Sequence, residues 1–296
     1  MEKKTTESGM HDIARELRKE QAAVKRKKFL KNKMAVVGLI ITMIAILVGI
    51  FAPLIANHDP LNMDPINRLK GPSSEFWFGT DKLGRDLFSR VIYATRYAML
   101  IGVAVTLITA ILGLIIGLYA SYYKVLDSIL MRICDGLKAI PTTLLALALM
   151  AALGASLKNV FISLVVVYTP SVARIARSQA LLIKEQTYIE AMKALGGKPS
   201  RIIWRHIAPN ILSPVIVQAS FIFAATIVTE AALSFLGAGV PVPQPSWGNI
   251  LYDGKEVIFN APWMICFPGI IMAVTVWGIN MFGDGLRDYL DPLTNN

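Results

Sequence analysis

Residues 98–123 read AMLIGVAVTLITAILGLIIGLYASYY and contain no charged side chain. As a helix, a stretch of this length measures about 39 Å and exceeds the roughly 30 Å hydrocarbon core of a bilayer. Lipid offers the backbone no hydrogen-bond partner, so a segment inside it must bond its own N–H and C=O groups. We therefore expect residues 98–123 to cross a membrane as a helix.

The composition of the whole chain agrees with that expectation. Of 296 residues, 54% are apolar and only 17% are charged, and the mean hydropathy is +0.53. An ordinary soluble domain carries about 25% charged residues. These apolar residues exceed what a globular core of this size can hide, which argues against a plain cytosolic enzyme.

Six stretches of low charge predict six spans, at residues 34–56, 98–123, 139–157, 159–173, 206–229 and 257–283. The fourth is short, at about 22 Å of helix. The positive-inside rule decides in its favour. With six spans and an inner amino terminus, 22 of the 30 Lys and Arg lie on the inner side, whereas deleting the fourth span leaves 15 on each side. We expect an all-α, six-span protein of the cell membrane with both chain ends in the cytoplasm.

This topology divides the chain into a basic tail and a membrane domain at residues 34–296. The tail, residues 1–33, holds 11 cations and is either a solvated, topology-setting segment or an amphipathic helix on anionic lipid. Outer loops are expected at residues 57–97 and 237–260. On the cytoplasmic side we expect a folded loop at residues 178–209 and a short tail at residues 284–296.

Motifs of common chemistries are absent from the sequence. There is no GxxxxGK[ST] phosphate loop, and no HExxH, GxSxG or CxxC string. Two cysteines and three scattered histidines suggest neither a disulfide framework nor a metal site. We therefore expect no catalysis, no cofactor and no metal in this chain.

The cytoplasmic loop contains the string QTYIEAMKALGGKPSRIIWRHIAPNILSP, residues 186–214, which predicts two short helices. In the first, Tyr188, Met192 and Leu195 recur at helical spacing, and Gly196 and Gly197 offer a left-handed stop. Pro199 suits the start of a second helix. That helix carries an apolar stripe and a basic pair, formed by Ile202, Ile203 and Ile207 and by Arg201 and Arg205. Such a hairpin either docks a soluble partner or packs under its own bundle.

This loop resembles the EAAxxxG signature of the membrane subunits of binding-protein-dependent ABC importers. Glu190, Ala191 and Gly196 match the signature in place, and Met192 replaces its second alanine. In the IxLP string that follows, Pro209 matches, while His206 and Ala208 stand at the Ile and Leu positions. Residues 76–96, 229–251 and 283–292 are similar to the C-type permease subunits of dipeptide and oligopeptide importers.

The resemblance implies the fold of a type I ABC importer permease and a role in moving peptides into the cytoplasm. It implies a homologous second permease, two ATPase subunits that bind ATP and Mg, and an extracytoplasmic binding protein, with no nucleic acid. The ATPase-docking residues it implies are Tyr188, Glu190, Ala191, Met192, Leu195, Gly196, Gly197, Arg201, Arg205 and Pro209. Alternatives are a permease for nickel or a metal chelate, a stand-alone channel or receptor, and an integral membrane enzyme.

Polar residues of the fifth span are candidates for a peptide pathway: Gln218, Ser220, Thr226 and Glu230. Ser, Thr and Gln also join helices to one another in membranes, so both roles stay open. Glu230 lies about 36 Å along the helix from His206, near the outer interface. It either bonds to a neighbouring span or the 237–239 turn, or acts in the pathway.

Three further expectations concern the outer side and the bends of the spans. Residues 81–96 predict an outer helix with apolar Leu87, Phe88, Val91 and Ile92 and polar Arg85 and Arg90, which either receives the binding protein or leads into the second span. Trp247 is expected to anchor an outer loop at the interface rather than to bind a ligand. Pro141 and Pro170 are expected to bend the third and fourth spans.

Overall fold

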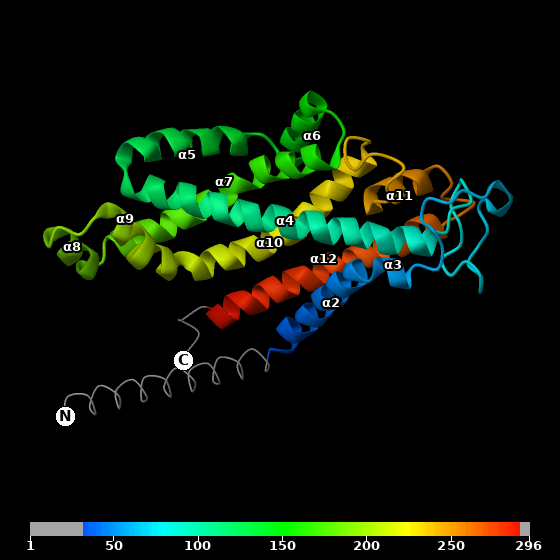
Figure 1. Ribbon diagram of the computed structural model, residues 1–296, viewed down its shortest axis with the longest axis horizontal. Coiled ribbons are helices and arrows are strands. Elements are labelled where there is room, and N and C mark those ends of the chain that lie inside the picture. The colour runs from blue at the N-terminus through cyan, green and yellow to red at the C-terminus, as the bar shows by residue number, and fades with distance from the viewer. Residues whose placement is uncertain (1–31, 291–296) are drawn as a thin grey trace.

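The computed structural model describes residues 32–290, and its regular elements are helices arranged along one long axis (Figure 1). The basic tail predicted at residues 1–33 lies almost wholly outside the described residues. In chain order the elements are α2 (Lys33–Ile50), α3 (Ala52–Ile55), η1 (Pro65–Asn67), α4 (Leu87–Tyr122), α5 (Lys124–Ala139), α6 (Thr142–Leu153), α7 (Leu157–Lys184), α8 (Thr187–Ala194), α9 (Pro199–Ile202), η2 (Ile203–Ile207), α10 (Ala208–Phe235), α11 (Trp247–Lys255) and α12 (Trp263–Leu290).

Five helices are long and apolar enough to cross a membrane within the described range. They are α2, α4, α7, α12 and the continuous run from Pro199 to Phe235 that joins α9, η2 and α10. The pair α5 and α6 raises the number to six if it is counted as one broken span. The expected all-α membrane architecture is confirmed, with five spans, or six if the bent pair is one span.

The weak span is the third, and not the fourth as the uncharged lengths suggest. α7 runs for 28 residues, about 42 Å, because Lys158 and Arg174 are accommodated within the helix. α6 has only 12 residues, and it meets α5 at an angle of 96°. Pro141 lies at this break, where it precedes the first residue of α6 and cannot continue the helix of α5. The bend expected at Pro141 is therefore present and divides the span.

Other helices extend beyond the apolar stretches that predicted them. α4 begins at Leu87, so the predicted outer helix continues directly into the second span. Asp86 caps it by accepting a hydrogen bond from the Ser89 amide at 2.9 Å. α12 continues to Leu290 and includes most of the stretch expected as a tail. Hydropathy alone does not locate these ends, since helices continue past the lipid boundary wherever capping and packing support them.

Small residues allow α4 and α7 to approach closely. Gly113 and Gly117 are four apart on α4, and a Cβ at Gly117 would lie 2.6 Å from the Ala173 carbonyl oxygen of α7. A Cβ at Gly113 would lie 2.4 Å from Cβ of Val172. Only glycine fits at both positions, which is the small-xxx-small packing typical of membrane helices.

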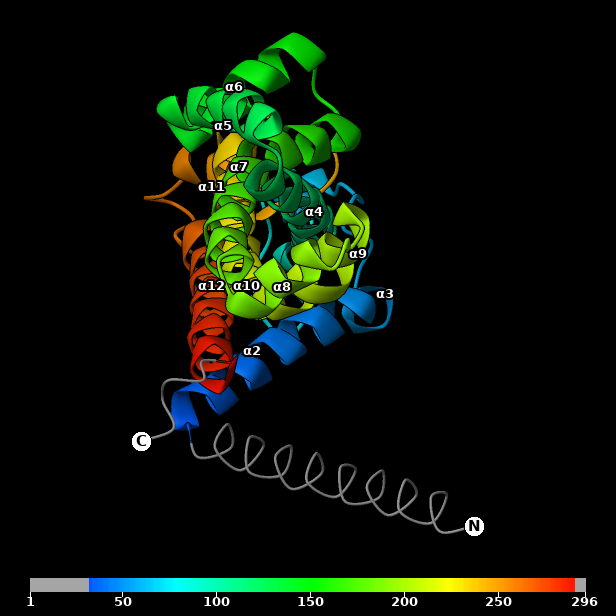
Figure 2. The ribbon, with the colours of Figure 1, turned by 90° about the vertical axis from the view of Figure 1, so that its left-hand side faces the viewer.

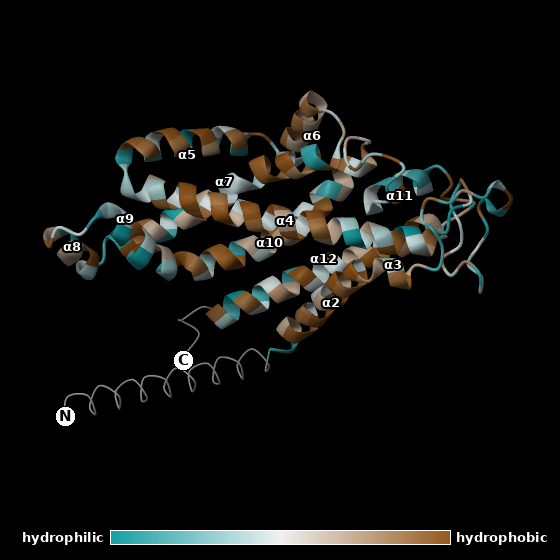
Figure 3. Cartoon of the chain, viewed as in Figure 1, coloured by the Kyte–Doolittle hydropathy of each residue, from teal (hydrophilic) through white to brown (hydrophobic). Residues whose placement is uncertain are grey.

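The helices form a bundle with distinct ends (Figures 1 and 2). α2 packs beside α12 along one side, and α5 lies over α7 on the other, held by the pair Arg174–Asp135 at 2.8 Å and by a second pair, Arg177–Asp127. α2 is apolar along nearly its whole length (Figure 3). We call the end formed by α8 and α9 the hairpin end. The opposite end, formed by residues 56–86 and 236–262, is the loop end.

Candidate functional site

The hairpin end consists of the two short helices predicted from the sequence. α8 covers Thr187–Ala194, and α9 begins at Pro199, the residue expected to start it. Gly196 has φ +77°, the left-handed conformation that glycine adopts without the strain of a Cβ. The amides of Gly196 and Gly197 bond back to the carbonyls of Lys193 and Met192 at 3.0 and 2.9 Å. These two hydrogen bonds terminate α8 and reverse the direction of the chain.

α8 buries a different residue from the ones that its apolar spacing singled out. Ile189 is 0% exposed, whereas Tyr188 is 44% and Leu195 is 87% exposed. Met192 is half-buried, and Glu190 and Ala191 are exposed. The apolar face of Tyr188 and Leu195 is therefore left uncovered by this chain.

The second helix is fixed firmly to the bundle. Ile202, Ile203 and Ile207, the predicted apolar stripe, are all at most 1% exposed. They lie where η2 packs against α4, α7 and α10. Residues Ile203–Ile207 form one π-helical turn, and the backbone then continues into α10 without a break. Such turns are rare and are found mostly at functional sites. The second helix of the hairpin is therefore joined by its backbone to α10 and packs against α4 and α7.

The exposed surface of the hairpin is basic as well as apolar. Arg201 and Arg205 are exposed on the side opposite the isoleucine stripe, and Lys193 and Lys198 are exposed beside the turn. Pro209 is also exposed, at the start of α10, while Gly196 and Gly197 form the turn between the helices. The structure thus brings the ten predicted docking residues to one end of the molecule. A partner with acidic and apolar groups would be complementary to this surface.

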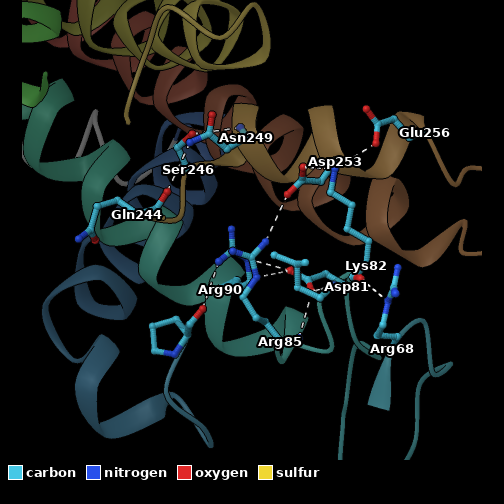
Figure 4. Close-up of polar contacts among 12 residues, drawn as sticks. Arg68, Asp81, Lys82, Arg85, Arg90, Gln244, Ser246, Asn249, Asp253 and Glu256 are labelled. Carbon is cyan, nitrogen blue, oxygen red and sulfur yellow. Dashed lines mark hydrogen bonds and ion pairs between the residues drawn. The ribbon is translucent and has the colours of Figure 1, made fainter. Parts of the chain in front are cut away.

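The loop end is built around a buried group of ions (Figure 4). Asp81 accepts a hydrogen bond from Nε of Arg85 at 2.6 Å, and Nε of Arg90 lies 3.5 Å from the same carboxylate oxygen. All three side chains are at most 4% exposed. Nη2 of Arg85 also reaches Asp253 on α11 at 3.3 Å. This group links the loop before α4 to a helix more than 160 residues later.

The expectation that Arg85 and Arg90 remain on a polar surface is wrong. Burial becomes acceptable for both because Asp81 pairs with them, and Arg90 also donates to the Pro60 carbonyl at 3.1 Å. The neighbouring residues Leu87, Phe88, Val91 and Ile92, predicted to form the apolar face of this helix, are buried within the chain.

Lys82 extends the group toward solvent. Its Nζ lies 2.9 Å from Asp253 and 3.0 Å from Glu256. Partial burial acts to lower the pKa of Lys82, but hydrogen bonds to the two carboxylates outweigh it and raise the pKa above the usual value of 10.5. The ammonium of Lys82 stays charged at every physiological pH, so its ion pairs between the loop and α11 are not broken by deprotonation of the lysine.

The four candidate pathway residues do not share one lining. Successive α-helical residues are about 100° apart, which places Gln218 and Ser220 on nearly opposite sides of α10. Thr226 is 0% exposed. Glu230 is 1% exposed and accepts a hydrogen bond from Ser234 Oγ at 2.6 Å, and Ser234 in turn accepts from the Val240 amide at 2.9 Å. Glu230 thus supports the turn after α10 through Ser234, which agrees with the structural interpretation.

Trp247 does not anchor a loop at the membrane interface, because it is 0% exposed at the start of α11. It packs with apolar residues of α4, α10 and α12. Its burial could not be predicted, since the proline-rich run before Trp247 indicates a loop. The sequence also did not reveal Asp253 as the distant partner of Arg85; only the spacing of Asp81 and Arg85, four apart, hints at an ion pair.

Comparison with known proteins gives matches over most of the chain. Residues 109–296 match the family model of the binding-protein-dependent transport system inner membrane component, and residues 21–72 match that of the N-terminal membrane domain of oligopeptide transport permease C. A dipeptide transport system permease of Alkalihalophilus pseudofirmus is 46% identical over 267 residues, covering 90% of this chain and 88% of that protein.

Two further comparisons point the same way. The oligopeptide transport system permease OppC of Bacillus subtilis is 40% identical, over 90% of this chain and 87% of the relative. Among solved structures, a chain of the MetNI methionine ABC transporter in an inward-facing conformation superposes with a TM-score of 0.58. That match covers 69% of this chain and 98% of the other at 19% identity, and it bears on the fold alone.

Proposed function

The chain belongs to the inner membrane components of binding-protein-dependent transport systems, as a permease subunit of a peptide ABC importer, and we propose that its hairpin end docks an ATPase subunit. The curated relatives named above are permeases of peptide transport systems, and neither is named for a metal chelate or a channel. The finer assignments concern partners, orientation and docking residues.

The exposed apolar face at Tyr188 and Leu195 is the observation that carries the docking proposal. Leu195 is 87% exposed at the tip of a turn whose backbone is fixed by Gly196. An apolar side chain held this way loses little conformational entropy on binding, so it is suited to enter a pocket of a partner. The exposed cations Arg201 and Arg205 flank it and favour an acidic rim.

The way in which the hairpin is mounted supports a mechanical role. α9, η2 and α10 form one continuous backbone, and the buried isoleucines fix its start between α4 and α7. When two ATPases close on ATP, a docked hairpin moves as a rigid unit and biases the bundle between outward and inward access. ATP and Mg bind to the ATPases, and this chain catalyses no reaction.

The proposed assembly contains this chain, a homologous second permease and two ATPases, and it receives peptide from an extracytoplasmic binding protein. Docking of a soluble ATPase requires the hairpin end to face the cytoplasm. The start of α2 and the end of α12, where Asn32 donates to Asp288 at 3.0 Å, then lie on the same side, which agrees with the excess of Lys and Arg predicted there. The loop end faces outward, toward the binding protein.

Affinity purification of the tagged importer tests this proposal. Wild type is compared with Glu190→Arg, which reverses an exposed charge on α8, and with Gly196→Pro, which excludes φ +77° and removes the amide that bonds to Lys193. We expect wild type to recover two ATPases and a second permease, and both variants to lose ATPases while keeping the second permease. A wild-type chain that purifies alone and transports peptide in liposomes would contradict the proposal.

A further inference from the structure

A pocket of about 410 Å³ opens at the loop end, outside the hairpin and the ion group described above. It lies between α3, residues 56–61, the outer turns of α4 and residues 244–245. Its polar lining comes from His58, Asp59, Tyr93, Tyr97 and Gln244. The volume falls within the range of about 300 to 1,000 Å³ that is typical of small-molecule sites.

Hydrogen bonds to α4 fix two walls of this pocket. The His58 amide donates to Ser89 Oγ at 3.0 Å, and Arg90 donates to the Pro60 carbonyl at 3.1 Å, which holds residues 58–60 against the helix. On the other side the Tyr97 hydroxyl donates to Oε1 of Gln244 at 2.8 Å. A site fixed before its ligand arrives loses less entropy on binding.

The charge of the lining indicates the kind of ligand. Asp59 brings a full negative charge, and one of its oxygens accepts the Leu61 amide at 2.8 Å. Within residues 32–290 no basic side chain forms an ion pair with Asp59. The neighbouring His58 instead places its Nδ1 3.7 Å from Oδ2 of Asp86. Asp59 is exposed to solvent and therefore accessible, and Tyr93 and Tyr97 line the same pocket. An accessible carboxylate and aromatic rings in one lining suit an organic cation, by charge and by cation–π contact.

The pocket also contains hydrogen-bond donors that suit an oxygen acceptor near the cation of the ligand. Because Oε1 of Gln244 accepts from Tyr97, the amide nitrogen of Gln244 remains available as a donor. The Tyr93 hydroxyl is a further donor in the same lining. The lining thus contains one charged acceptor, Asp59, together with donors for a carbonyl or phosphate oxygen.

We propose that this pocket binds a primary ammonium group that is close to an oxygen acceptor, as in the free amino terminus of a short peptide or the ethanolamine headgroup of a lipid. The peptide source rests on the proposed function, since peptides reach this face only if the chain serves a peptide importer. The lipid source does not depend on it.

The assembled importer in phosphatidylcholine nanodiscs, without binding protein, provides the test, with dialanine as the probe. We expect dialanine to bind wild type saturably and N-acetyl-dialanine, which lacks the ammonium, not to bind. Asp59→Asn removes the charge and is expected to weaken dialanine binding tenfold or more. Glu75→Gln is the matched control, because Glu75 is an exposed acid of the same loop outside the pocket, and it should leave binding unchanged.

A lipid arm separates the two sources. Importers purified from membranes that contain phosphatidylethanolamine are analysed for retained lipid by mass spectrometry. One result would assign the site to the lipid headgroup. In it, wild type and Glu75→Gln retain phosphatidylethanolamine, Asp59→Asn loses it, and none of them binds dialanine. If Asp59→Asn equals wild type toward both dialanine and lipid, the proposal is wrong.

Two further readouts keep the outcomes distinct. If Asp59→Asn weakens only the attachment of the binding protein, the pocket is a protein contact and the proposal is also wrong. ATP-driven peptide uptake is measured with the same purified wild-type importer reconstituted in liposomes together with the binding protein. If wild type takes up peptide but binds neither dialanine nor phosphatidylethanolamine, this inference alone is contradicted, whereas absence of uptake contradicts the proposed function.

Discussion

The two ends of the bundle are stabilised in opposite ways. At the loop end, Asp81, Arg85 and Arg90 are almost fully buried, and their contacts join residues far apart in the sequence. At the hairpin end, Leu195 and Tyr188 are exposed, and the segment is held by buried Ile189 of α8 together with the isoleucine stripe. The loop end pairs its buried arginines with carboxylates of the same chain, whereas the hairpin end leaves apolar side chains exposed. Buried charge must be paired inside the chain, but an exposed apolar face can wait for a partner.

Removing the buried carboxylate of the loop end is expected to have the largest effect on stability. Asp81→Ala leaves Arg85 and Arg90 buried without their shared counter-ion, and we expect it to reduce the free energy of unfolding by about 3 to 5 kcal/mol. Thermal unfolding in detergent measures the change, with Glu75→Ala, an exposed acid of the same loop, as the control. Equal melting temperatures for both variants would show that the ion group contributes nothing.

Shortening a buried isoleucine that anchors the hairpin is expected to give the second-largest loss of stability. Ile203 is 1% exposed, so Ile203→Ala removes buried methyl groups and should reduce the free energy of unfolding by about 2 to 4 kcal/mol. Arg205→Ala, two residues away and exposed, should change it by less than about 0.5 kcal/mol. Thermal unfolding of the two variants makes the comparison. A similar loss in both would mean that the stripe is not the anchor.

The turn of the hairpin gives a smaller effect of predictable sign. Gly196→Ala meets no atom within 4 Å, so its destabilisation, about 1 kcal/mol, comes from φ +77° alone. Gly136→Ala is the matched control, since it too meets no atom within 4 Å but lies inside α5, where alanine favours the helix by a similar amount. Hydrogen exchange of α8 and α5 amides should change in opposite directions, and a change of the same sign would refute the backbone explanation.

The exposed face should give the smallest effect on stability and a clear effect on assembly. The double variant Tyr188→Ser, Leu195→Ser removes little buried surface and should alter the free energy of unfolding by less than about 0.5 kcal/mol. Recovery of ATPases with the purified importer should nevertheless fall severalfold. Unchanged recovery would separate this face from docking.

The success of prediction from sequence differs between local and distant features. Charge-free length and the distribution of Lys and Arg are properties of single segments, and they gave the membrane class and most of the long helices. The turn at Gly196 and the helix start at Pro199 were also predictable, because both depend on backbone preferences of one residue. The break at Pro141 was anticipated as a bend, although its extent was not.

Features that depend on distant partners could not be predicted. Burial of Arg85 requires Asp253, which arrives from α11, and burial of Trp247 requires helices α4, α10 and α12 around it. The length of α7 was underestimated because Lys158 and Arg174 were counted as its ends, whereas Arg174 lies within the helix and pairs with Asp135 of α5. The docking roles of Glu190 and its neighbours stay predictions.

Site-specific photo-crosslinking in the intact importer tests the contrast between the ends most directly. A benzophenone amino acid replaces Leu195 at the hairpin end or Ile66 at the loop end, two apolar positions that are each 87% exposed. The account predicts a crosslink to an ATPase subunit from position 195 and none from position 66. A crosslink to an ATPase from position 66, or its absence from position 195 in an assembled importer, would contradict it.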